Sequence, residues 1–258
     1  VKLRLRELRI AVRECRDEDE RLRLKRRIAE LTPLCREGRE TAALLERYEY
    51  DITLHRVIIR EHTNPDWPTR ICFDEWGVWH PEANLDNNQN QRQSLRDALF
   101  AALTLHIFYR NADIVDFAME TQISNLLQSL FETDGARFYK TPTFYVMKLL
   151  KEHLGQRVIP LLPDDVDDRL DAVATAGEDG SRITVSLVNI DLLEEKTVRL
   201  ALPQGDWRVE KADVLTALLT SVDNMEKAIA APDGADYKTG VDLVLRQFME
   251  VLQKLGLE

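Results

Sequence analysis

The segment Ile71-Cys-Phe-Asp-Glu-Trp-Gly-Val-Trp-His-Pro81 decides the fold, because it joins a short apolar run to two carboxylates and two tryptophans. An apolar run of this length that is followed by turn residues is typical of a β-strand. In a (β/α) barrel, the residues that follow the strands form the catalytic face. Aromatic rings beside a carboxylate suit a sugar, since its CH groups stack on indole while the carboxylate approaches the anomeric carbon. An Asp-Glu pair at the end of a strand is more often part of an ordinary surface turn, so the residues alone leave both interpretations open.

The residues around this segment alternate between helical and strand-like patterns. A helix is predicted through His62, followed by a break at 64–68 and a strand at 70–73. Further along the chain, the pattern predicts a helix at 92–110, a strand at 114–119 and a helix at 141–154. Alternation of this kind indicates βα units, so we predict a partial (β/α) barrel over residues 51–165.

The remaining segments have different patterns. Residues 166–217 contain two β-branched runs, 183–189 and 197–202, between Gly- and Pro-containing turns, which predicts an antiparallel β-sandwich region. Helical spacing of apolar residues predicts a helical hairpin at 1–50 and a pair of helices at 218–258. The predicted fold class is therefore mixed α/β plus β, with a partial (β/α) barrel, a C-terminal antiparallel β-sandwich region and helical segments at both ends.

Composition and charge exclude several classes of protein. The chain has 258 residues, of which 44% are hydrophobic and 31% charged, so it can bury a core and is not a disordered chain. Its 35 basic and 45 acidic residues give a net charge of −10, which disfavours nucleic acid as the main partner. The most apolar run, 98–109, is too short to cross a bilayer, so no membrane span is predicted.

Cysteine, histidine and glycine patterns give no cofactor or metal site. Three scattered cysteines without a CxxC pair indicate free thiols in a reducing compartment, and we expect a cytoplasmic protein. The five histidines lack metal-ligand spacing, and no glycine-rich nucleotide motif occurs. The N-terminus has no apolar signal sequence and does not begin with methionine, which is compatible with a fragment.

Several motifs in the same order resemble glycoside hydrolase family 51, the retaining α-L-arabinofuranosidases. The resemblance extends from about residue 69 to residue 217. It rests on Asp74-Glu75-Trp76 with Val78-Trp79, on the helix-like runs 95–99 and 101–105, on Gln122, Asn125 and Gln128, on Thr133-Asp134-Gly135 and Thr141-Pro142-Thr143, and on the β-rich stretch 171–217.

The resemblance implies a site, a substrate class and a missing part. By similarity, Glu75 is the nucleophile, Trp79 part of the subsite wall and Gln122 a hydroxyl-binding residue, and the substrate is an arabinofuranoside-containing saccharide of hemicellulose. A retaining glycosidase also needs an acid/base carboxyl. In the family this is the Glu of an Asn-Glu pair on an earlier strand, and this sequence contains no Asn-Glu pair. About half of the barrel is absent, so we expect an incomplete enzyme. Glu120 could stand in as the acid, but an ordinary surface or loop glutamate is the favoured interpretation.

The last 41 residues, 218–258, resemble the central helices of GrpE, the nucleotide exchange factor of DnaK-type chaperones. This similarity implies a homo-oligomer through the terminal helices and, as an alternative, a DnaK-type chaperone as partner. The alternative function is therefore a non-catalytic interaction or oligomerisation protein. A fragment, a gene fusion or an artificial mosaic would also explain the order of segments.

Overall fold

The computed structural model describes residues 43–64, 66–162, 169–191, 195–203 and 205–215. Most of the predicted hairpin at 1–50 and all of the predicted helix pair at 218–258 lie outside the described residues. The resemblance to GrpE and the oligomerisation that it implies therefore remain predictions. The first described element is a helix over residues 43–62, which runs without interruption across residue 50.

A βαβ unit follows this helix and positions the candidate site. Strand β1 (Ile71–Trp76) pairs in parallel with β2 (Val115–Glu120), and helix α3 (Leu95–Arg110) connects them after the short 3-10 helix η1 (Leu85–Asn87). The predicted strands at 70–73 and 114–119 and the predicted helix at 92–110 are thus confirmed. No third strand pairs with β1 or β2 among the described residues, so the structure shows α/β units and not a barrel.

The sequence explains why α3 begins and ends where it does. Ser94 accepts a hydrogen bond from the Arg96 backbone N–H, while the Asp97 carboxylate accepts one from the Ser94 backbone N–H. This reciprocal capping box satisfies backbone donors that an open first turn leaves without partners. The helix ends at Asn111, whose backbone N–H donates to carbonyls of the last turn.

An aromatic cluster forms the core between helix 43–62, β1 and α3. Trp76 and Phe100 are each only 1% exposed. The rings of Phe73 and Phe108 have their centroids 4.7 Å apart, and Tyr48 packs on both from helix 43–62. Burial of several aromatic side chains supplies a large part of the stability of a domain of this size.

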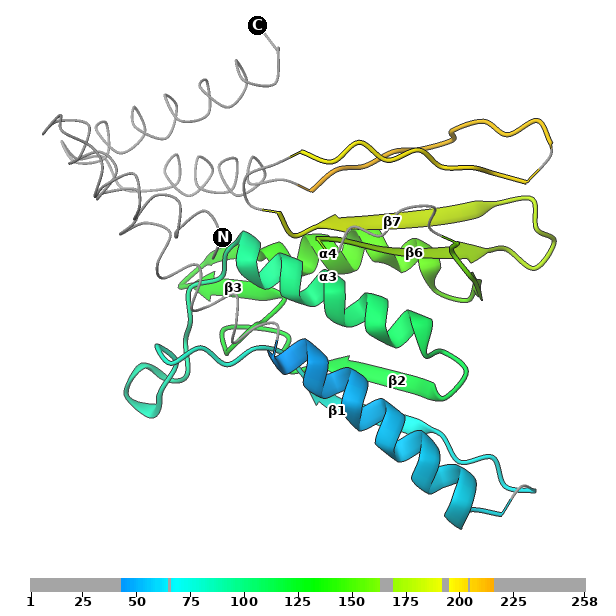
Figure 1. Ribbon diagram of the computed structural model, residues 1–258. Helices are drawn as coiled ribbons and strands as arrows, with labels where there is room; N and C mark the ends of the chain where they lie inside the picture. Colours follow the sequence, from blue (N-terminus) through cyan, green and yellow to red (C-terminus); the bar gives the residue numbers. More distant parts are fainter. Residues whose placement is uncertain (1–42, 65, 163–168, 192–194, 204, 216–258) are drawn as a thin grey trace, which may run out of the picture.

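The second half of the described chain is a hairpin, a helix and an antiparallel sheet. The hairpin pairs β3 (Phe131–Asp134) with β4 (Arg137–Lys140), and α4 (Pro142–Leu150) with the 3-10 helix η2 (Lys151–His153) follows. The sheet has the order β5 (Arg157–Ile159), β6 (Leu170–Ala176) and β7 (Ile183–Asn189). In Figure 1 β6 and β7 lie along α3 and α4, on the opposite side of α3 from β1 and β2.

The predicted strand at 183–189 is confirmed, but the one at 197–202 is not. Residues 195–203 have no regular secondary structure and carry no strand arrow in Figure 1. The prediction rested on alternating apolar residues, yet Val198, Leu200 and Leu202 are 37%, 49% and 44% exposed. An alternating pattern favours a strand when one face is buried, and this face is not.

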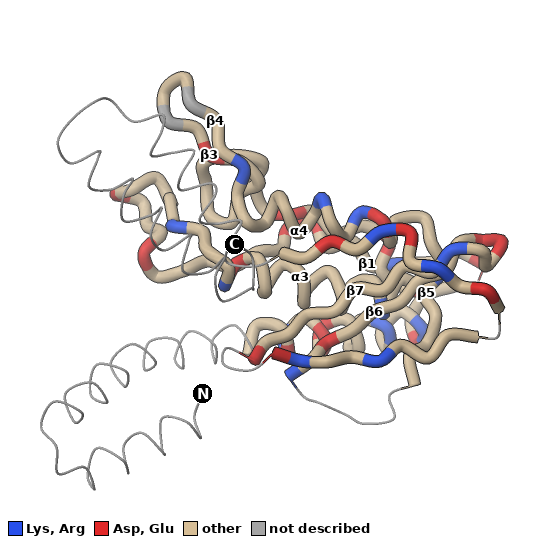
Figure 2. The backbone as a smooth tube through the Cα atoms, turned by 90° about the horizontal axis from the view of Figure 1, so that it is seen from above, with Lys and Arg blue, Asp and Glu red and all other residues tan. Residues whose placement is uncertain are grey.

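Acidic and basic side chains are interspersed along the described chain, as Figure 2 shows. Some of them join elements that are distant in sequence. Arg110 of α3 donates to both carboxylate oxygens of Asp171 on β6, at 2.6 and 3.0 Å. In the described part of the chain, no helix combines the length and the hydropathy that a membrane crossing requires.

Candidate functional site

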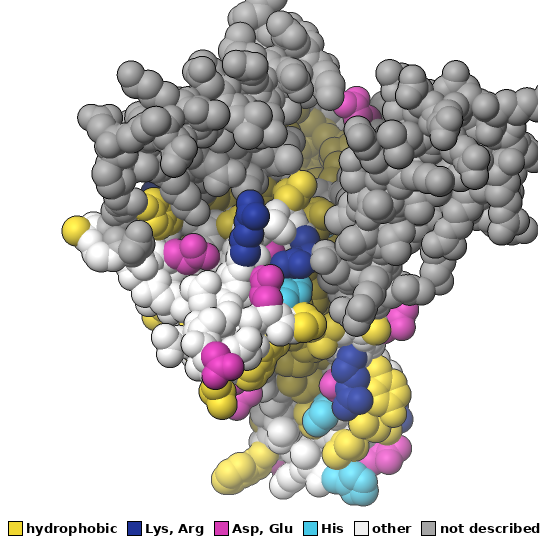
Figure 3. All heavy atoms as spheres, turned by 90° about the vertical axis from the view of Figure 1, so that its left-hand side faces the viewer, with side chains coloured by type: hydrophobic (Ala, Val, Ile, Leu, Met, Phe, Trp, Pro, Cys, Tyr) yellow, Lys and Arg dark blue, Asp and Glu magenta, His cyan; other side chains and the backbone are white. Residues whose placement is uncertain are grey.

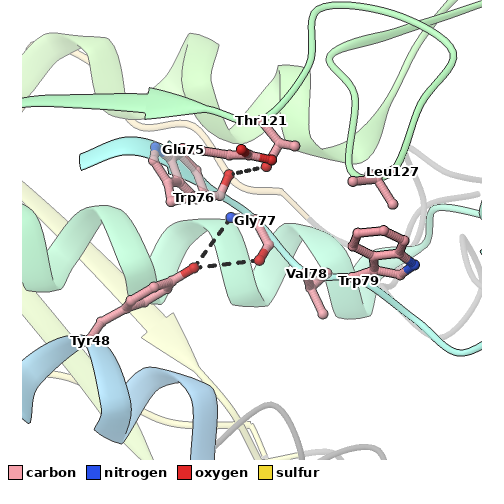
Figure 4. A pocket seen from close by; sticks show the side chains of 8 residues that line it. All are labelled: Tyr48, Glu75, Trp76, Gly77, Val78, Trp79, Thr121 and Leu127. Atoms are coloured by element: carbon pink, nitrogen blue, oxygen red, sulfur yellow. Dashed lines mark hydrogen bonds between the residues drawn. The ribbon is translucent and has the colours of Figure 1, made fainter. Parts of the chain in front are cut away.

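A pocket of about 110 Å³ lies at the carboxyl end of β1, where the sequence predicts a site. Its lining residues come from helix 43–62, β1 and the loops after β1 and β2: Tyr48, Glu75, Trp76, Gly77, Val78, Trp79, Thr121 and Leu127 (Figure 4). Complete small-molecule sites usually enclose about 300–1,000 Å³. The described residues therefore form one wall of a site rather than a closed cavity.

The structure brings Glu75 and Trp79 together in this pocket, with Gly77 between them (Figure 4). Trp79 is 59% exposed, and its indole N–H donates to the Ala83 carbonyl at 2.8 Å, which fixes the ring while leaving much of it accessible. Glu75 is also exposed. Among the described residues that line the pocket, Glu75 is the single carboxylate.

An irregularity in β1 explains why Glu75 faces outward. The register between β1 and β2 shifts between Phe73 and Trp76. In a regular strand, residues three apart point to opposite faces. Here Phe73 and Trp76 both contact Phe108 in the core, with Trp76 1% exposed, so the shifted register places two exposed carboxylates, Asp74 and Glu75, between two core anchors.

The backbone that follows Glu75 is held by side chains from several elements. The Trp76 carbonyl accepts from the Thr121 hydroxyl at 2.5 Å and from the Thr121 N–H at 2.9 Å. The Val78 N–H donates to the Gln128 side-chain oxygen at 2.9 Å. The Val78 carbonyl accepts from the Gln91 side chain at 3.0 Å. A loop whose backbone groups are satisfied in this way keeps one geometry, as a preorganised site requires.

The side chains that hold the loop are themselves held. Gln128 is fully buried, and its amide nitrogen donates to the Asp97 carbonyl at 2.8 Å and to the Thr143 hydroxyl at 3.1 Å. Gln91 also accepts from the His80 N–H at 3.0 Å, and a His80 ring nitrogen lies 2.9 Å from the Asp97 carboxylate. The support therefore reaches from the loop into the N-terminal turn of α3 and into α4.

Gly77 is required by the geometry of this loop. Its φ angle is +156°, a conformation that L side chains rarely adopt. A Cβ atom at this position would lie 2.5 Å from the Thr121 hydroxyl oxygen, the same oxygen that donates to Trp76. The glycine therefore permits both the turn and the close approach of the two strand ends.

Gln122 is exposed and does not line the pocket, although its neighbour Thr121 does. The Gln122 backbone N–H donates to the Glu120 carboxylate at 3.2 Å. The structure therefore does not bring the predicted hydroxyl-binding residue into the pocket with Glu75, although it is the sequence neighbour of a lining residue.

The sequence favours an ordinary surface or loop position for Glu120, and the structure corrects this. Glu120 is the last residue of β2 and pairs with Trp76 of β1. Its Oε1 atom is buried without a hydrogen-bond partner among the described residues. Burial raises the pKa of the Glu120 carboxyl to about 8, although the backbone N–H groups of Gln122 and Thr121 oppose this shift. The Glu120 carboxyl does not line the pocket that contains Glu75.

Three supporting residues, Thr121, Tyr48 and Gln91, have no pattern in the sequence that predicts their role. Tyr48 belongs to a helix, and its apolar neighbours at helical spacing predict only a core position. Gln91 lies in a polar loop, where a glutamine has no distinguishing pattern. Within the described ranges, no three His, Cys, Asp or Glu side chains converge to hold a metal ion.

Figure 3 views the side of the molecule on which β1 and β2 end, the left of Figure 1. The described surface there is largely uncharged, with separate acidic, basic and histidine side chains among apolar ones. Such a surface suits a neutral polar ligand better than a strongly charged one.

Comparison with known proteins identifies the family. A model of the α-L-arabinofuranosidase C-terminal domain matches residues 74–238, which is more than half of the chain. An intracellular exo-α-L-arabinofuranosidase of Bacteroides ovatus is 31% identical over 194 residues, covering 69% of this chain and 37% of the relative. A probable α-L-arabinofuranosidase C of Aspergillus niger is 32% identical over 155 residues, covering 52% and 30%.

Among solved structures, the family 51 arabinofuranosidase of Xanthomonas axonopodis pv. citri matches with 30% identity and a TM-score of 0.48, over 56% of this chain and 31% of that one. The chain thus spans well under half the length of the relatives that it matches. On the match at residues 74–238, it belongs to the family of α-L-arabinofuranosidase C-terminal domains.

Proposed function

We propose that this chain provides the nucleophile side of a retaining α-L-arabinofuranosidase site, with Glu75 as the nucleophile. The observation that supports this role is the placement of Glu75, an exposed carboxylate between two core anchors at the end of β1, on a loop fixed by side chains of other elements. A nucleophile must be held close to its attack position, and a misplacement of about 1 Å can cost about 100-fold in rate.

The proposed reaction has two steps. Glu75 attacks the anomeric carbon of a terminal arabinofuranosyl group and forms a glycosyl-enzyme, which water then hydrolyses. Trp79 stacks on the apolar face of the sugar, and Gln122 binds a hydroxyl group. The substrate class is an arabinofuranoside-containing saccharide such as hemicellulose.

The first step also requires a proton for the leaving oxygen. In retaining glycosidases the two carboxyls are about 5–5.5 Å apart. Since Glu75 is the single carboxylate among the described lining residues, the acid must come from outside the described wall. We therefore expect this chain alone to form the glycosyl-enzyme with substrates that need little acid assistance, and not to hydrolyse natural saccharides at a useful rate.

The test is a dinitrophenyl α-L-arabinofuranoside, whose leaving group departs without a proton. Wild-type protein, Glu75→Gln and the adjacent-carboxylate control Asp74→Asn are incubated with it, and peptides are analysed by mass spectrometry for one added pentosyl group. We expect the adduct on Glu75 in the wild type and in Asp74→Asn, and no adduct in Glu75→Gln. An unlabelled wild-type protein would contradict the assignment.

A further inference from the structure

Tyr48 lies outside the residues matched by the family model, 74–238, yet it lines the pocket together with Glu75. Its ring is fixed by three aromatic neighbours, with centroid distances of 5.8 Å to Phe73, 6.2 Å to Phe100 and 6.1 Å to Phe108. The ring therefore has little freedom, and its hydroxyl group is presented at a defined point beside β1.

That hydroxyl binds both backbone polar groups of a single residue of the loop, Gly77. The Gly77 N–H donates to the Tyr48 oxygen at 3.3 Å, and the Tyr48 O–H donates to the Gly77 carbonyl at 3.4 Å (Figure 4). In an extended strand, the N–H and the carbonyl of one residue point to the same edge, where a neighbouring strand would bind both. A phenol is both donor and acceptor, so one side chain takes the place of that strand.

The bonds on the opposite edge show why this contact matters. Trp76 and Val78 are held on the side of β2 and its following loop, by Thr121 and Gln128. Gly77 faces away from them, toward helix 43–62, and Tyr48 is its hydrogen-bond partner there. The loop is thus clamped from both edges, two residues after Glu75.

We propose that Tyr48 is a positioning residue for the candidate nucleophile, acting through the Gly77 peptide and making no contact with the sugar. The catalytic part of this inference rests on the proposed function of Glu75, whereas the clamp on Gly77 does not. Burial raises the pKa of the Tyr48 hydroxyl, the Gly77 hydrogen bond opposes the shift, and the negative charge of Glu75 adds to it. The Tyr48 hydroxyl therefore stays protonated and remains a hydrogen-bond donor to the Gly77 carbonyl.

The experiment compares Tyr48→Phe with Tyr109→Phe. Both substitutions remove only a hydroxyl that bonds to a backbone carbonyl, since Tyr109 donates to the Leu150 carbonyl at 3.1 Å. Tyr109 does not line the pocket and so reports the general effect of such a loss. The first measurement is hydrogen exchange of the Gly77 amide by NMR on protein labelled at its 10 glycines. The second is the rate of Glu75 labelling by the dinitrophenyl arabinofuranoside.

We expect Tyr48→Phe to accelerate Gly77 exchange about 5- to 10-fold, the effect of losing one hydrogen bond, and Tyr109→Phe to leave it unchanged. The labelling rate should fall about 10-fold in Tyr48→Phe alone. Unchanged exchange would overturn the clamp, and faster exchange with unchanged labelling would overturn the positioning of Glu75. If the wild type is not labelled, the proposed function fails, and the exchange rates then decide separately whether Tyr48 holds Gly77.

Discussion

Two polar networks in this molecule do different work. The loop after Glu75 is held mainly by uncharged side chains, those of Tyr48, Thr121, Gln128 and Gln91. The layer between α3 and the β6–β7 sheet is joined by two buried histidines, His106 and His153. The first network fixes backbone beside an exposed carboxylate, and the second connects two layers of the fold. The uncharged side chains of the first network predict no change in stability with pH near neutrality, whereas the histidines of the second predict one.

The second network is a chain of hydrogen bonds centred on Ser186 of β7. Its hydroxyl lies 2.7 Å from His106 Nε2 and 2.9 Å from His153 Nε2. His153 Nδ1 lies 2.9 Å from the Thr175 hydroxyl on β6. A serine has one proton to donate, so it donates to one histidine and accepts from the other. Protonation of His153 would place a second donor against Thr175 or Ser186 in a buried site.

The largest expected effect concerns the first network. Gln128→Leu removes three hydrogen bonds at once and leaves the Val78 N–H, the Asp97 carbonyl and the Thr143 hydroxyl without this partner. Buried groups that lose a partner cost about 1–3 kcal/mol each. We expect the free energy of unfolding in urea to fall by about 3–5 kcal/mol. Gln122→Leu, at an exposed position, is the control and should change it by less than about 0.5 kcal/mol. Equal stability of the two variants would contradict the role of Gln128.

The second prediction separates the two networks by pH. Burial and, to a smaller extent, the nearby His106 together lower the pKa of His153 from 6.5 to about 4. The unfolded chain therefore binds a proton below pH 6.5 that the folded chain does not, and stability is lost as the pH falls from about 6.5 to about 4. We expect His153 to contribute a loss of about 2–3 kcal/mol across this window, which the raised pKa of Glu120 partly offsets in the wild type, because Glu120 favours the folded state at lower pH.

Urea titrations at several pH values measure this loss. Asp171 does not add to the change in stability over this pH range. Burial raises the pKa of its carboxyl, but the hydrogen bonds and charges of His106 and Arg110 outweigh burial and hold the pKa below its ordinary value. The titrations are made on Glu120→Gln, which removes the opposite contribution of that carboxyl, and there the further change His153→Asn should lower the baseline stability and largely abolish the dependence on pH between 4 and 6.5. A dependence of the same size in the variant would assign the effect to another group.

The third prediction concerns Glu120, a titratable group on the strand that flanks the loop. Its pKa is raised by burial to about 8, so the unfolded chain releases a proton above pH 4.5 that the folded chain retains. Stability is therefore lost as the pH rises from about 4.5 to about 8. Glu120→Gln removes this cost and should stabilise the protein by about 1–3 kcal/mol at pH 8, discounted for the partly exposed side chain, and by much less at pH 5. Equal stabilisation at both pH values would show that the charge is not the cause.

The sequence predicts the strand and the helix that carry the site better than it predicts the hydrogen bonds that hold the loop in place. The strand at 70–73 and the helix at 92–110 follow from local periodicity, and the motif at 74–79 places Glu75 and Trp79 in one pocket. The contact between Tyr48 and Gly77 joins residues 29 apart, and that between Val78 and Gln128 joins residues 50 apart. Such contacts depend on how the elements pack, which no local pattern encodes. The missing strand at 197–202 has the same cause, because alternation predicts a strand only where a buried face exists.

The smallest expected effect on stability is at Trp79. At this residue, a role in binding the sugar can be separated from a role in holding the loop. The side chain is 59% exposed and contributes one hydrogen bond, to Ala83, so Trp79→Ala should lower the free energy of unfolding by less than about 1 kcal/mol. If its ring stacks on the sugar, the same variant should slow Glu75 labelling by about 3- to 10-fold. Trp67→Ala is the matched control, since this indole is 77% exposed and does not line the pocket. Equal labelling rates in the two variants would remove Trp79 from the proposed subsite, whereas a large loss of stability in Trp79→Ala would make it part of the network that holds the loop.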